Sequence, residues 1–249
     1  MTVYKSKILL AIALALFNAN IFADFDEKQK QEIGTVVHDY LVANPEVVAE
    51  AIQALQVKEN KIWLDNAKTA IKENIQDIFN SNSPKLGGKD AKISVVEFFD
   101  YNCPHCKTMS PLIENLLKNK DIQIIYKELP VLGESSLYAA KAALAARDQN
   151  KFKEFHEKLM AYPRVLTNDK ILELAKETGL NVEKLKKDMD SPEVTQELQN
   201  NQKVAVALGM RGTPTFILGR NPATKEMPVG FIPGETSQEE LTKQIDSLR

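Results

Sequence analysis

The stretch VVEFFDYNCPHC, residues 95–106, contains both cysteines of this chain of 249 residues. An apolar run that is typical of a buried strand leads into Cys103-Pro104-His105-Cys106, and a segment with helical spacing follows. We therefore expect Cys103 at the N-terminus of a helix, where unpaired backbone N–H groups and the helix dipole favour a thiolate. A thiolate is the reactive form in disulfide exchange, and a second cysteine three residues later can resolve a mixed disulfide. The motif predicts redox-active dithiol chemistry.

The two residues between the cysteines fit this chemistry. Pro104 suits the first turn of a helix, because its missing N–H would have no partner there. His105 is expected to stabilise the Cys103 thiolate by a hydrogen bond or by a positive charge. A stabilised thiolate favours the reduced protein, so that the disulfide form becomes the stronger oxidant. The motif therefore favours donation of disulfides over their removal.

A cysteine pair at this spacing also forms half of a zinc site, which needs four ligands. The chain has only three histidines, His38, His105 and His156, and none stands at paired ligand spacing. We therefore expect no zinc and no bound cofactor, whereas binding of Cu(I) by the two thiolates stays an alternative. His38 and His156 lie in helical segments and are interpreted as surface or capping residues.

Two further positions bear on the chemistry. Glu97 lies inside the apolar strand, six residues before Cys103, where an unpaired carboxylate is costly. It is interpreted either as the carrier of the proton that Cys106 exchanges or as one half of a structural ion pair, with Lys127 as the expected partner. Thr213-Pro214 precedes a late apolar strand, where proline is tolerated; a cis bond and a plain trans turn are both considered.

The first residues predict export. Two lysines precede an unbroken apolar stretch of ten residues, Ile8–Phe17, and Ile21–Ala23 offers a cleavage site. Ten apolar residues are too few to span a bilayer, so residues 1–23 are interpreted as a signal peptide rather than as a membrane anchor. No cysteine near residue 23 is available to carry a lipid. We expect a periplasmic or secreted protein, and any association with the outer membrane is expected to be peripheral.

Three regions follow the signal peptide. Residues 24–80 are helical in period, with apolar stripes on two segments that Asn44-Pro45 separates. Residues 81–89 are rich in polar residues and glycine and are expected to be a linker. Residues 90–249 begin as strand, helix and strand, which predicts a right-handed βαβ unit, and about 134–210 is expected to be a helical insertion. The fold class is therefore α/β.

The two front helices are too short to bury their apolar stripes against each other alone. We expect residues 24–80 to associate with other copies of the chain, as a homodimer or a homotrimer. The alternative is that these helices wrap around the catalytic domain of their own protomer. Trp63, the only tryptophan, is interpreted as a core or interface residue rather than as a substrate platform.

Charge and length narrow the possible roles. The formal net charge is −2, and removal of residues 1–23 takes away two lysines and no acidic residue, which gives −4. This mild acidic balance, without a basic run, gives no support for nucleic-acid binding. The remaining chain is long enough for a substantial core, and closing so short a loop between two cysteines removes little chain entropy. The cysteine pair is therefore expected to be catalytic rather than a structural staple.

Taken together, these residues resemble the DsbA family of thioredoxin-fold periplasmic enzymes. The likeness covers about residues 90–249 and consists of the strand and Cys-Pro-His-Cys motif, Pro111 in the following helix, the helical insertion and the late Thr-Pro. It implies a thioredoxin fold, with an acid and a lysine at the positions of Glu97 and Lys127. It also implies that Pro214 is cis and lies against the cysteine pair, where it holds an extended substrate together with Thr213.

The front segment is similar to the N-terminal helices of a subgroup of that family. The subgroup includes secreted surface-antigen-like and copper-resistance-associated members, and the stretch HDYLVANPEV, residues 38–47, carries the likeness. In those relatives the segment mediates formation of dimers or trimers. The sequence thus predicts a thioredoxin fold with a helical insertion, preceded by an N-terminal helical oligomerisation segment.

The predicted function is thiol–disulfide exchange that introduces or rearranges disulfide bonds in cysteine-containing secreted proteins. The family implies a membrane redox partner, of the quinone-linked oxidising type or of the reducing type, that resets the cysteines. Cys-Pro-His-Cys resembles monomeric oxidases, whereas oligomerising helices and a threonine before the cis-proline resemble isomerases. Disulfide donation is the favoured function. The alternative is an oligomeric isomerase or reductase that is kept reduced, and a further alternative is a Cu(I)-binding or chaperone-like protein.

Overall fold

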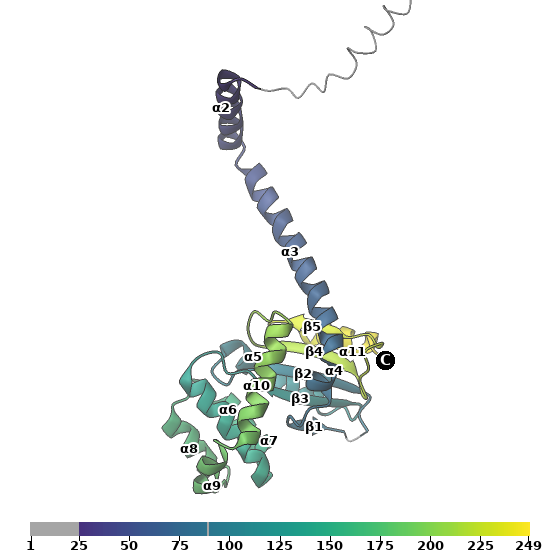
Figure 1. Ribbon diagram of the computed structural model, residues 1–249. Coiled ribbons are helices and arrows are strands. Elements are labelled where there is room, and N and C mark those ends of the chain that lie inside the picture. Colours follow the sequence, from purple (N-terminus) through teal and green to yellow (C-terminus); the bar gives the residue numbers. More distant parts are fainter. Residues whose placement is uncertain (1–24, 89) are drawn as a thin grey trace, which may run out of the picture. The chain divides into compact units, whose positions relative to one another are not determined.

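The computed structural model describes residues 25–88 and 90–249, so the predicted signal peptide lies outside the described residues. The chain divides after Lys58 into two units, whose described parts are residues 25–58 and residues 59–88 with 90–249 (Figure 1). Within these ranges, no helix combines the length and the apolar composition that crossing a membrane requires.

The first unit is helical. Helix α2, Glu27–Ala43, begins with a capping box in which Asp26 and Gln29 each accept the backbone N–H of the other. The break expected at Asn44-Pro45 is confirmed, because α3, Glu46–Glu73, begins directly after it.

The apolar stripe of the first unit is exposed. No residue between 25 and 58 is buried, and Val36, Val37 and Tyr40 each keep half or more of their surface accessible. Because no other part of this unit covers these side chains, the unit does not form a hydrophobic core of its own.

The second unit is built on a five-stranded sheet with the order β1-β3-β2-β4-β5. The strands are β1 Lys85–Gly87, β2 Ile93–Phe99, β3 Ile122–Glu128, β4 Thr215–Arg220 and β5 Gly230–Pro233. Strands β2 and β3 are parallel and are joined by α5, Pro104–Leu116, whereas the other neighbouring strands pair antiparallel. The predicted βαβ unit and the α/β class are confirmed.

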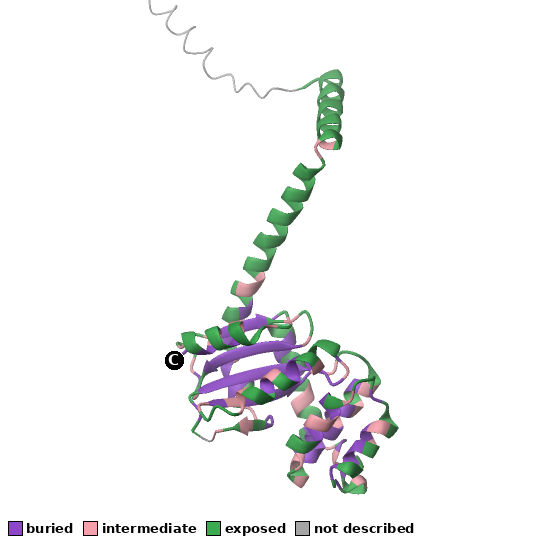
Figure 2. Ribbon diagram, turned by 180° about the vertical axis from the view of Figure 1, so that it is seen from behind, coloured by how far each residue is buried: buried purple, intermediate pink, exposed green. Residues whose placement is uncertain are grey.

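The sheet is covered on both faces. All seven residues of β2 are buried, and five of them are apolar, as expected for a strand covered on both faces (Figure 2). One core, which we call the cysteine-side core, contains Cys106, Phe99 and Tyr126 together with helices of the insertion. The other core lies on the opposite face and contains Phe98 and Ile217.

The second core recruits residues that precede the expected domain boundary. Ile71 of α3 and Phe79 of α4, Ile75–Phe79, are almost completely buried in it. The structure therefore places the division at Lys58 instead of residue 80. Lys85–Gly87, expected in a linker, forms β1. The helical period of α3 did not reveal this division, because apolar residues recur at the same spacing along its exposed and its buried parts.

The expected helical insertion is present and joins β3 to β4. It consists of α6 Glu134–Ala146, a 3₁₀ turn at Arg147–Gln149, α7 Phe152–Ala161, α8 Asn168–Glu177, α9 Val182–Asp188 and α10 Pro192–Ala207. The side chains of Thr167, Asn181 and Ser191 cap α8, α9 and α10 by accepting a backbone N–H of the first turn. The chain ends with α11, Gln238–Ser247, which Ser237 caps in the same way.

Candidate active site

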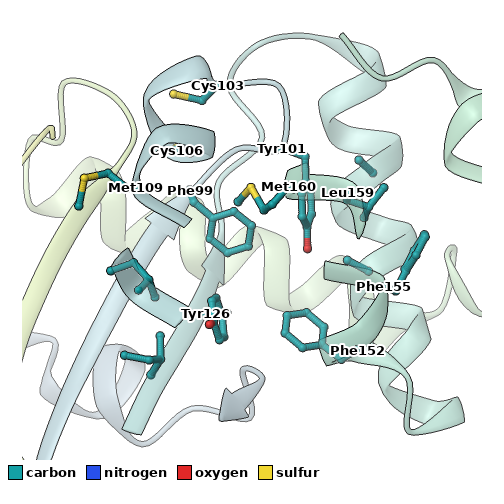
Figure 3. Packing of buried hydrophobic residues seen from close by; sticks show 14 of the residues in the cluster. Phe99, Tyr101, Cys103, Cys106, Met109, Tyr126, Phe152, Phe155, Leu159 and Met160 are labelled. Carbon is teal, nitrogen blue, oxygen red and sulfur yellow. The ribbon is translucent and has the colours of Figure 1, made fainter. Parts of the chain in front are cut away.

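The two cysteines stand where β2 leads into α5. Cys103 is the N-cap of this helix, with an extended backbone, and Pro104 occupies the first helical turn. Cys106 is fully buried in that turn, and Cys103 is 4% exposed. Figure 3 shows both at the margin of the cysteine-side core, near Phe99 and Met109. The predicted placement of Cys103 at a helix N-terminus is confirmed.

The surroundings of the two sulfurs shift their pKa values in opposite directions. A hydrogen bond from the Cys106 thiol lowers the pKa of Cys103 to about 5, although burial acts in the opposite direction. The Thr213 side chain and the backbone N–H groups of residues 105 and 106 lower this pKa further. The same Cys106–Cys103 bond, together with burial, raises the pKa of Cys106. At neutral pH the pair therefore holds one thiolate, on Cys103, and one thiol, on Cys106.

His105 has a partner that the motif did not indicate. Its exposed ring places Nδ1 2.8 Å from Oε1 of Glu235, and hydrogen bonding to this carboxylate raises the pKa of His105. A protonated imidazole next to Cys103 favours the thiolate. Glu235 follows β5, more than a hundred residues from the motif, so no local signal could have identified it.

The loop before β4 lies against Cys103. The Thr213–Pro214 peptide bond is cis, as the family resemblance implied, and the alternative of a trans turn is excluded. Sγ of Cys103 is 3.2 Å from the carbonyl oxygen of Thr213, to which Cys103 donates a hydrogen bond when it is protonated. Pro214 is buried, whereas Thr213 is partly exposed beside the reactive sulfur.

Glu97 lies beneath the cysteines and is not ion-paired. It is 2% exposed, and its Oε1 has no hydrogen-bond partner among the described residues. Burial, and after it the negative charge of Cys103, raises the pKa of Glu97 to about 8. Its charge in turn contributes to the raised pKa of Cys106. At neutral pH this side chain is mostly a neutral carboxylic acid, and its titration is coupled to the charges of the two cysteines.

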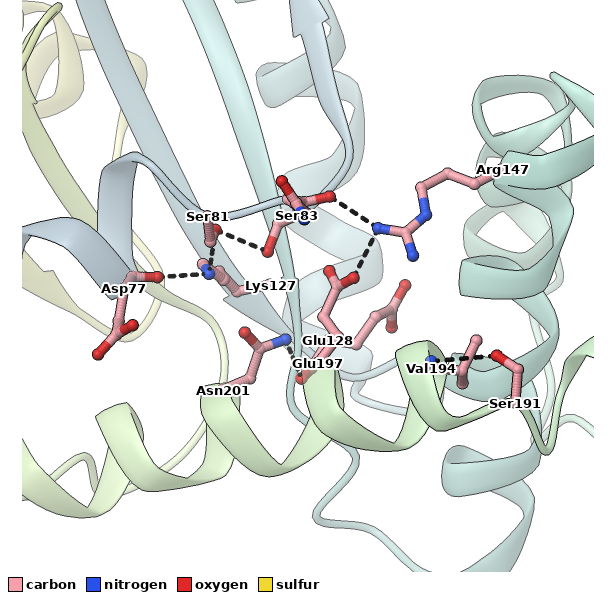
Figure 4. A network of polar contacts seen from close by, with 11 residues as sticks. Asp77, Ser81, Ser83, Lys127, Glu128, Arg147, Ser191, Val194, Glu197 and Asn201 are labelled. Carbon is pink, nitrogen blue, oxygen red and sulfur yellow. Dashed lines mark hydrogen bonds and ion pairs between the residues drawn. The ribbon is translucent and has the colours of Figure 1, made fainter.

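Lys127 does not pair with Glu97. In the β2–β3 register Glu97 stands opposite Tyr126, and Lys127 stands opposite Phe98, so the two charged side chains point to opposite faces of the sheet. The Lys127 ammonium instead donates to the carbonyl oxygen of Asp77 at 2.7 Å and to the Ser81 hydroxyl at 2.6 Å (Figure 4). The expected ion pair is therefore corrected to a structural contact between β3 and the segment after α3.

The turn directly before Cys103 is fixed by two polar side chains. Asp100 accepts hydrogen bonds from the backbone N–H groups of Asn102, Val131 and Leu132, at 2.7 to 3.0 Å. The Asn102 amide donates to two serine hydroxyls at the start of α6 and accepts the N–H of Leu166. These hydrogen bonds attach the turn to the helical insertion. The position of two polar residues directly after an apolar strand could have indicated this role.

A buried polar group lies behind the turn. The Tyr101 hydroxyl is 3.0 Å from Oε1 of Glu128 and 3.0 Å from Nδ1 of His156. His156 is 3% exposed, and burial lowers its pKa to about 3, so its interpretation as a surface or capping residue is wrong. His38 is exposed, as predicted. The helical period of the sequence alone did not show that His156 lies on the buried face of α7.

The described residues offer no multidentate metal site. In residues 25–88 and 90–249, no group of three or more histidine, cysteine, aspartate or glutamate side chains is arranged to hold a metal ion. Binding of a soft ion would therefore rely on the two sulfurs of Cys103 and Cys106.

Comparison with known proteins agrees with this site and places the chain in a family. Residues 94–246 match the DSBA-like thioredoxin domain, and residues 29–61 match the copper resistance protein ScsC N-terminal domain. The chain therefore belongs to the DsbA family of thioredoxin-fold, thiol–disulfide oxidoreductases, and the expected thioredoxin fold is confirmed.

Three relatives illustrate the likeness. The thiol:disulfide interchange protein DsbA of Bordetella pertussis is 25% identical over 62% of this chain and 77% of its own. The crystal structure of BcfH from Salmonella enterica Typhimurium has 28% identity and a TM-score of 0.73, covering 89% of this chain and 96% of its own. Proteus mirabilis ScsC in a transitional conformation has 32% identity and a TM-score of 0.62, covering 91% and 97%.

Proposed function

We propose that the protein donates disulfide bonds to cysteine-containing proteins outside the cytoplasm through a redox-active Cys103–Cys106 pair. The observation that supports this role best is the unequal division of protons between the sulfurs: the pKa of Cys103 is lowered to about 5, and that of Cys106 is raised. Stabilising the Cys103 thiolate stabilises the reduced protein, and this makes the disulfide form a stronger oxidant.

The first step is attack on the enzyme disulfide. A substrate thiolate attacks Sγ of Cys103, a mixed disulfide forms, and Cys106 leaves as a thiolate. Burial still raises the pKa of Cys106 when Cys103 is held in the mixed disulfide, so this leaving group needs a proton. The neutral carboxylic acid of Glu97 is placed to supply it, and general acid catalysis of this kind is worth about 10²–10⁴ in rate.

The second step releases the product. A second substrate thiolate attacks the substrate's own sulfur in the mixed disulfide, and Cys103 leaves as its stable thiolate. The substrate loses two electrons and two protons. The enzyme takes up both electrons and, once Glu97 has regained its proton, one proton net, so it ends with a Cys103 thiolate and a Cys106 thiol while the other proton goes to solvent. Thr213 and Pro214 lie against Cys103 and would align the extended substrate during both steps. A membrane redox partner would then reoxidise the pair.

The first experiment concerns the cysteines. In the full chain, Cys103→Ser should abolish oxidation of a dithiol peptide, whereas Cys106→Ser should accumulate the mixed disulfide, because the resolving thiol is missing. Acid trapping of the redox state in intact cells, followed by a mass-tagged thiol reagent, tests the direction of exchange. A mostly oxidised pair agrees with disulfide donation. A mostly reduced pair would replace donation by isomerase or reductase activity.

The isomerase alternative rests on the first unit. Residues 29–61 match the N-terminal domain of ScsC, and the apolar side chains of residues 25–58 are uncovered within that unit. We infer that these residues join copies of the chain into a dimer or a trimer. Several active sites around one substrate would suit the rearrangement of wrong disulfides.

Self-association has a matched test. Val36 in the first unit and Val206 in the second are both 69% exposed. Val36→Glu should reduce the mass measured by light scattering to that of the monomer, because a charge in an apolar interface is costly. Val206→Glu should leave the mass unchanged. A wild-type chain that is already monomeric at all concentrations would remove the oligomer from the proposal.

We also propose that residues 1–23 direct export to the periplasm. Lys5 and Lys7 and the following apolar stretch support this role. Fractionation of cells that express the full chain should recover a shortened protein in the periplasmic fraction, and a chain of unchanged mass in the cytoplasm would contradict export.

A further inference from the structure

The second half of α3 is attached to the loop that contains the cis-proline. The indole Nε1 of Trp63 donates a hydrogen bond to the carbonyl oxygen of Gly209 at 2.9 Å. The Arg211 guanidinium lies 4.0 Å from the centroid of the Trp63 ring and donates to Oδ1 of Asn60 at 2.9 Å. All four residues belong to the second unit. We call these contacts of Asn60 and Trp63 with Gly209 and Arg211 the α3 clamp.

The Trp63 ring is itself fixed by its neighbours. It meets Phe231 edge to face, with 5.6 Å between ring centroids. Gly209 has a φ of +60°, and a Cβ at that position would lie 3.3 Å from Nε1 of Trp63, so the ring lies directly on the backbone of this glycine. Further along α3, Ala67 and Ile71 are buried in the second core. The clamp therefore joins the loop to a helix that the core keeps in place.

The loop makes few backbone contacts of its own. Helix α10 ends at Ala207, and β4 begins at Thr215. Among the described residues, the backbone N–H groups of residues 211–213 donate no bond to another backbone group. Arg211 and Gly212 are also exposed. The attachment of this part of the loop therefore depends on the Arg211 side chain.

The loop continues directly to the reactive sulfur. The carbonyl oxygen of Thr213 lies 3.2 Å from Sγ of Cys103. After the cis bond, the carbonyl oxygen of Pro214 accepts the backbone N–H of Gly234 at 2.8 Å. The loop is thus fixed by backbone bonding after the proline and by the α3 clamp before it. Because a misplacement of about 1 Å can cost about 10² in rate, the clamp bears on exchange without touching a sulfur.

We propose that Trp63 and Asn60 are positioning residues of the exchange reaction and act through Arg211. They hold the cis-proline loop in the place where it aligns an incoming polypeptide with Cys103. The inference rests on the proposed function and adds to it two residues that precede the matched thioredoxin domain, residues 94–246. A chain shortened to that domain loses the clamp although it keeps both cysteines.

The experiment compares two reductants of the oxidised full chain. One is a dithiol peptide, which extends along the loop, and the other is dithiothreitol, which has no polypeptide backbone to align. Each converts its own two thiols into a disulfide and reduces the disulfide of the Cys103–Cys106 pair, so electrons balance as in the proposed function. The peptide rate constant divided by that of dithiothreitol, the rate ratio, measures alignment separately from the reactivity of the cysteines.

Arg211→Met removes the guanidinium from an exposed position. It should lower the peptide rate constant about tenfold, within the roughly 10² that misplacement can cost, and leave that of dithiothreitol within about twofold. Trp63→Leu should lower the rate ratio in the same way, and Trp63→Phe, which keeps an aromatic face for the guanidinium, should recover most of the loss. Because the two side chains act as one unit, the double variant should be no slower than the slower single variant.

Two matched controls account for the other effects of these changes. Ile62→Ala shortens an exposed apolar side chain next to Trp63 on the same helix. Arg164→Met removes a positive charge from the exposed loop between α7 and α8. Both variants should keep the wild-type rate ratio.

The outcomes separate the α3 clamp from the proposed function. If the wild type does not oxidise the dithiol peptide, the proposed function fails. If the wild type does so and Arg211→Met keeps its rate ratio, the exchange chemistry stands and the clamp does not position the loop. Equal losses with both reductants would overturn the inference, as would losses that multiply in the double variant or a control that loses the ratio as strongly as Arg211→Met.

Discussion

Opposite faces of the central sheet bury Lys127 and Glu97, and these two ionisable side chains are held differently. Lys127 on one face donates two short hydrogen bonds to groups near the end of α4. Glu97 on the other face, toward the cysteines, has a carboxylate oxygen with no partner among the described residues. Both side chains are almost completely buried. Their hydrogen-bond partners, rather than their burial, therefore determine what each can do.

The difference in hydrogen bonding gives Lys127 a structural role and leaves Glu97 available for proton transfer. A buried charge with hydrogen-bond partners fixes two chain segments to each other, and its proton does not need to move. A buried carboxyl without a partner is held in its neutral form by desolvation and releases its proton when a nearby charge changes. The raised pKa of Glu97 agrees with this second state, and the charge on Cys103 is one of its causes.

The largest expected effect is the pH dependence of stability that Glu97 creates. Its native pKa of about 8 lies above the ordinary 4.5 of the unfolded chain, so the native state retains a proton that the unfolded state releases. This contribution is complete below pH 4.5 and is lost as the pH rises through 8, a loss of about 5 kcal/mol. Glu97→Gln should therefore gain stability over the wild type between pH 5 and pH 9, as measured by urea unfolding of the reduced proteins.

Because both proteins keep Cys103 and Cys106, titration of the thiols affects each of them and largely cancels in the difference. A difference in unfolding free energy that stays constant from pH 5 to pH 9 would show that the Glu97 carboxyl is not held neutral by its surroundings.

Lys127 should produce a smaller effect of opposite sign in a higher pH window. Burial lowers its pKa from 10.5 to about 8, so between these values the unfolded chain binds the proton and the native protein does not. Stability therefore rises with pH across this window, by about 3 kcal/mol. The stability of Lys127→Met relative to the wild type should fall by that amount between pH 7.5 and pH 10.5. An unchanged relative stability would refute the lowered pKa.

The rate of exchange should distinguish the two faces directly. At pH 7, Glu97→Gln should slow oxidation of a dithiol peptide by about 100-fold, the lower end of what general acid catalysis contributes, because Cys106 then leaves without a proton donor. Lys127→Met is the matched control, a buried ionisable residue on the opposite face, and should stay within about twofold of the wild type. Equal losses in the two variants would mean that Glu97 acts through stability alone.

The exposed pair of His105 and Glu235 should show the smallest effect. Hydrogen bonding to the Glu235 carboxylate raises the pKa of His105, so Glu235→Gln should lower it. Because both side chains are exposed, solvent screens the pair, and only a small decrease in the pKa of His105 is expected. NMR titration of the His105 ring measures this shift. Thiolate absorbance should show a still smaller rise in the pKa of Cys103, and a larger rise would contradict the screening.

Much of the active site could be predicted because its signals are local. The cysteine motif, the apolar strand before it and the helical periods of the insertion each lie within a few consecutive residues. The side to which Lys127 points could not be predicted, because it depends on strand register, and a shift of one residue reverses the face. Glu235 and the burial of His156 depend on contacts between segments that are distant in the sequence.

The attachment of α3 to the late part of the chain has a consequence for the order of folding. Trp63 bonds to Gly209, 146 residues away, and Ile71 shares a core with Ile217 and Phe231. Contacts between such distant segments form late, because a long loop must close before they contribute stability. During synthesis, the second core cannot be completed until β4 and β5 have left the ribosome. The second core of the growing chain therefore remains incompletely packed for most of its synthesis, a state that would suit the proposed export through a translocation pore.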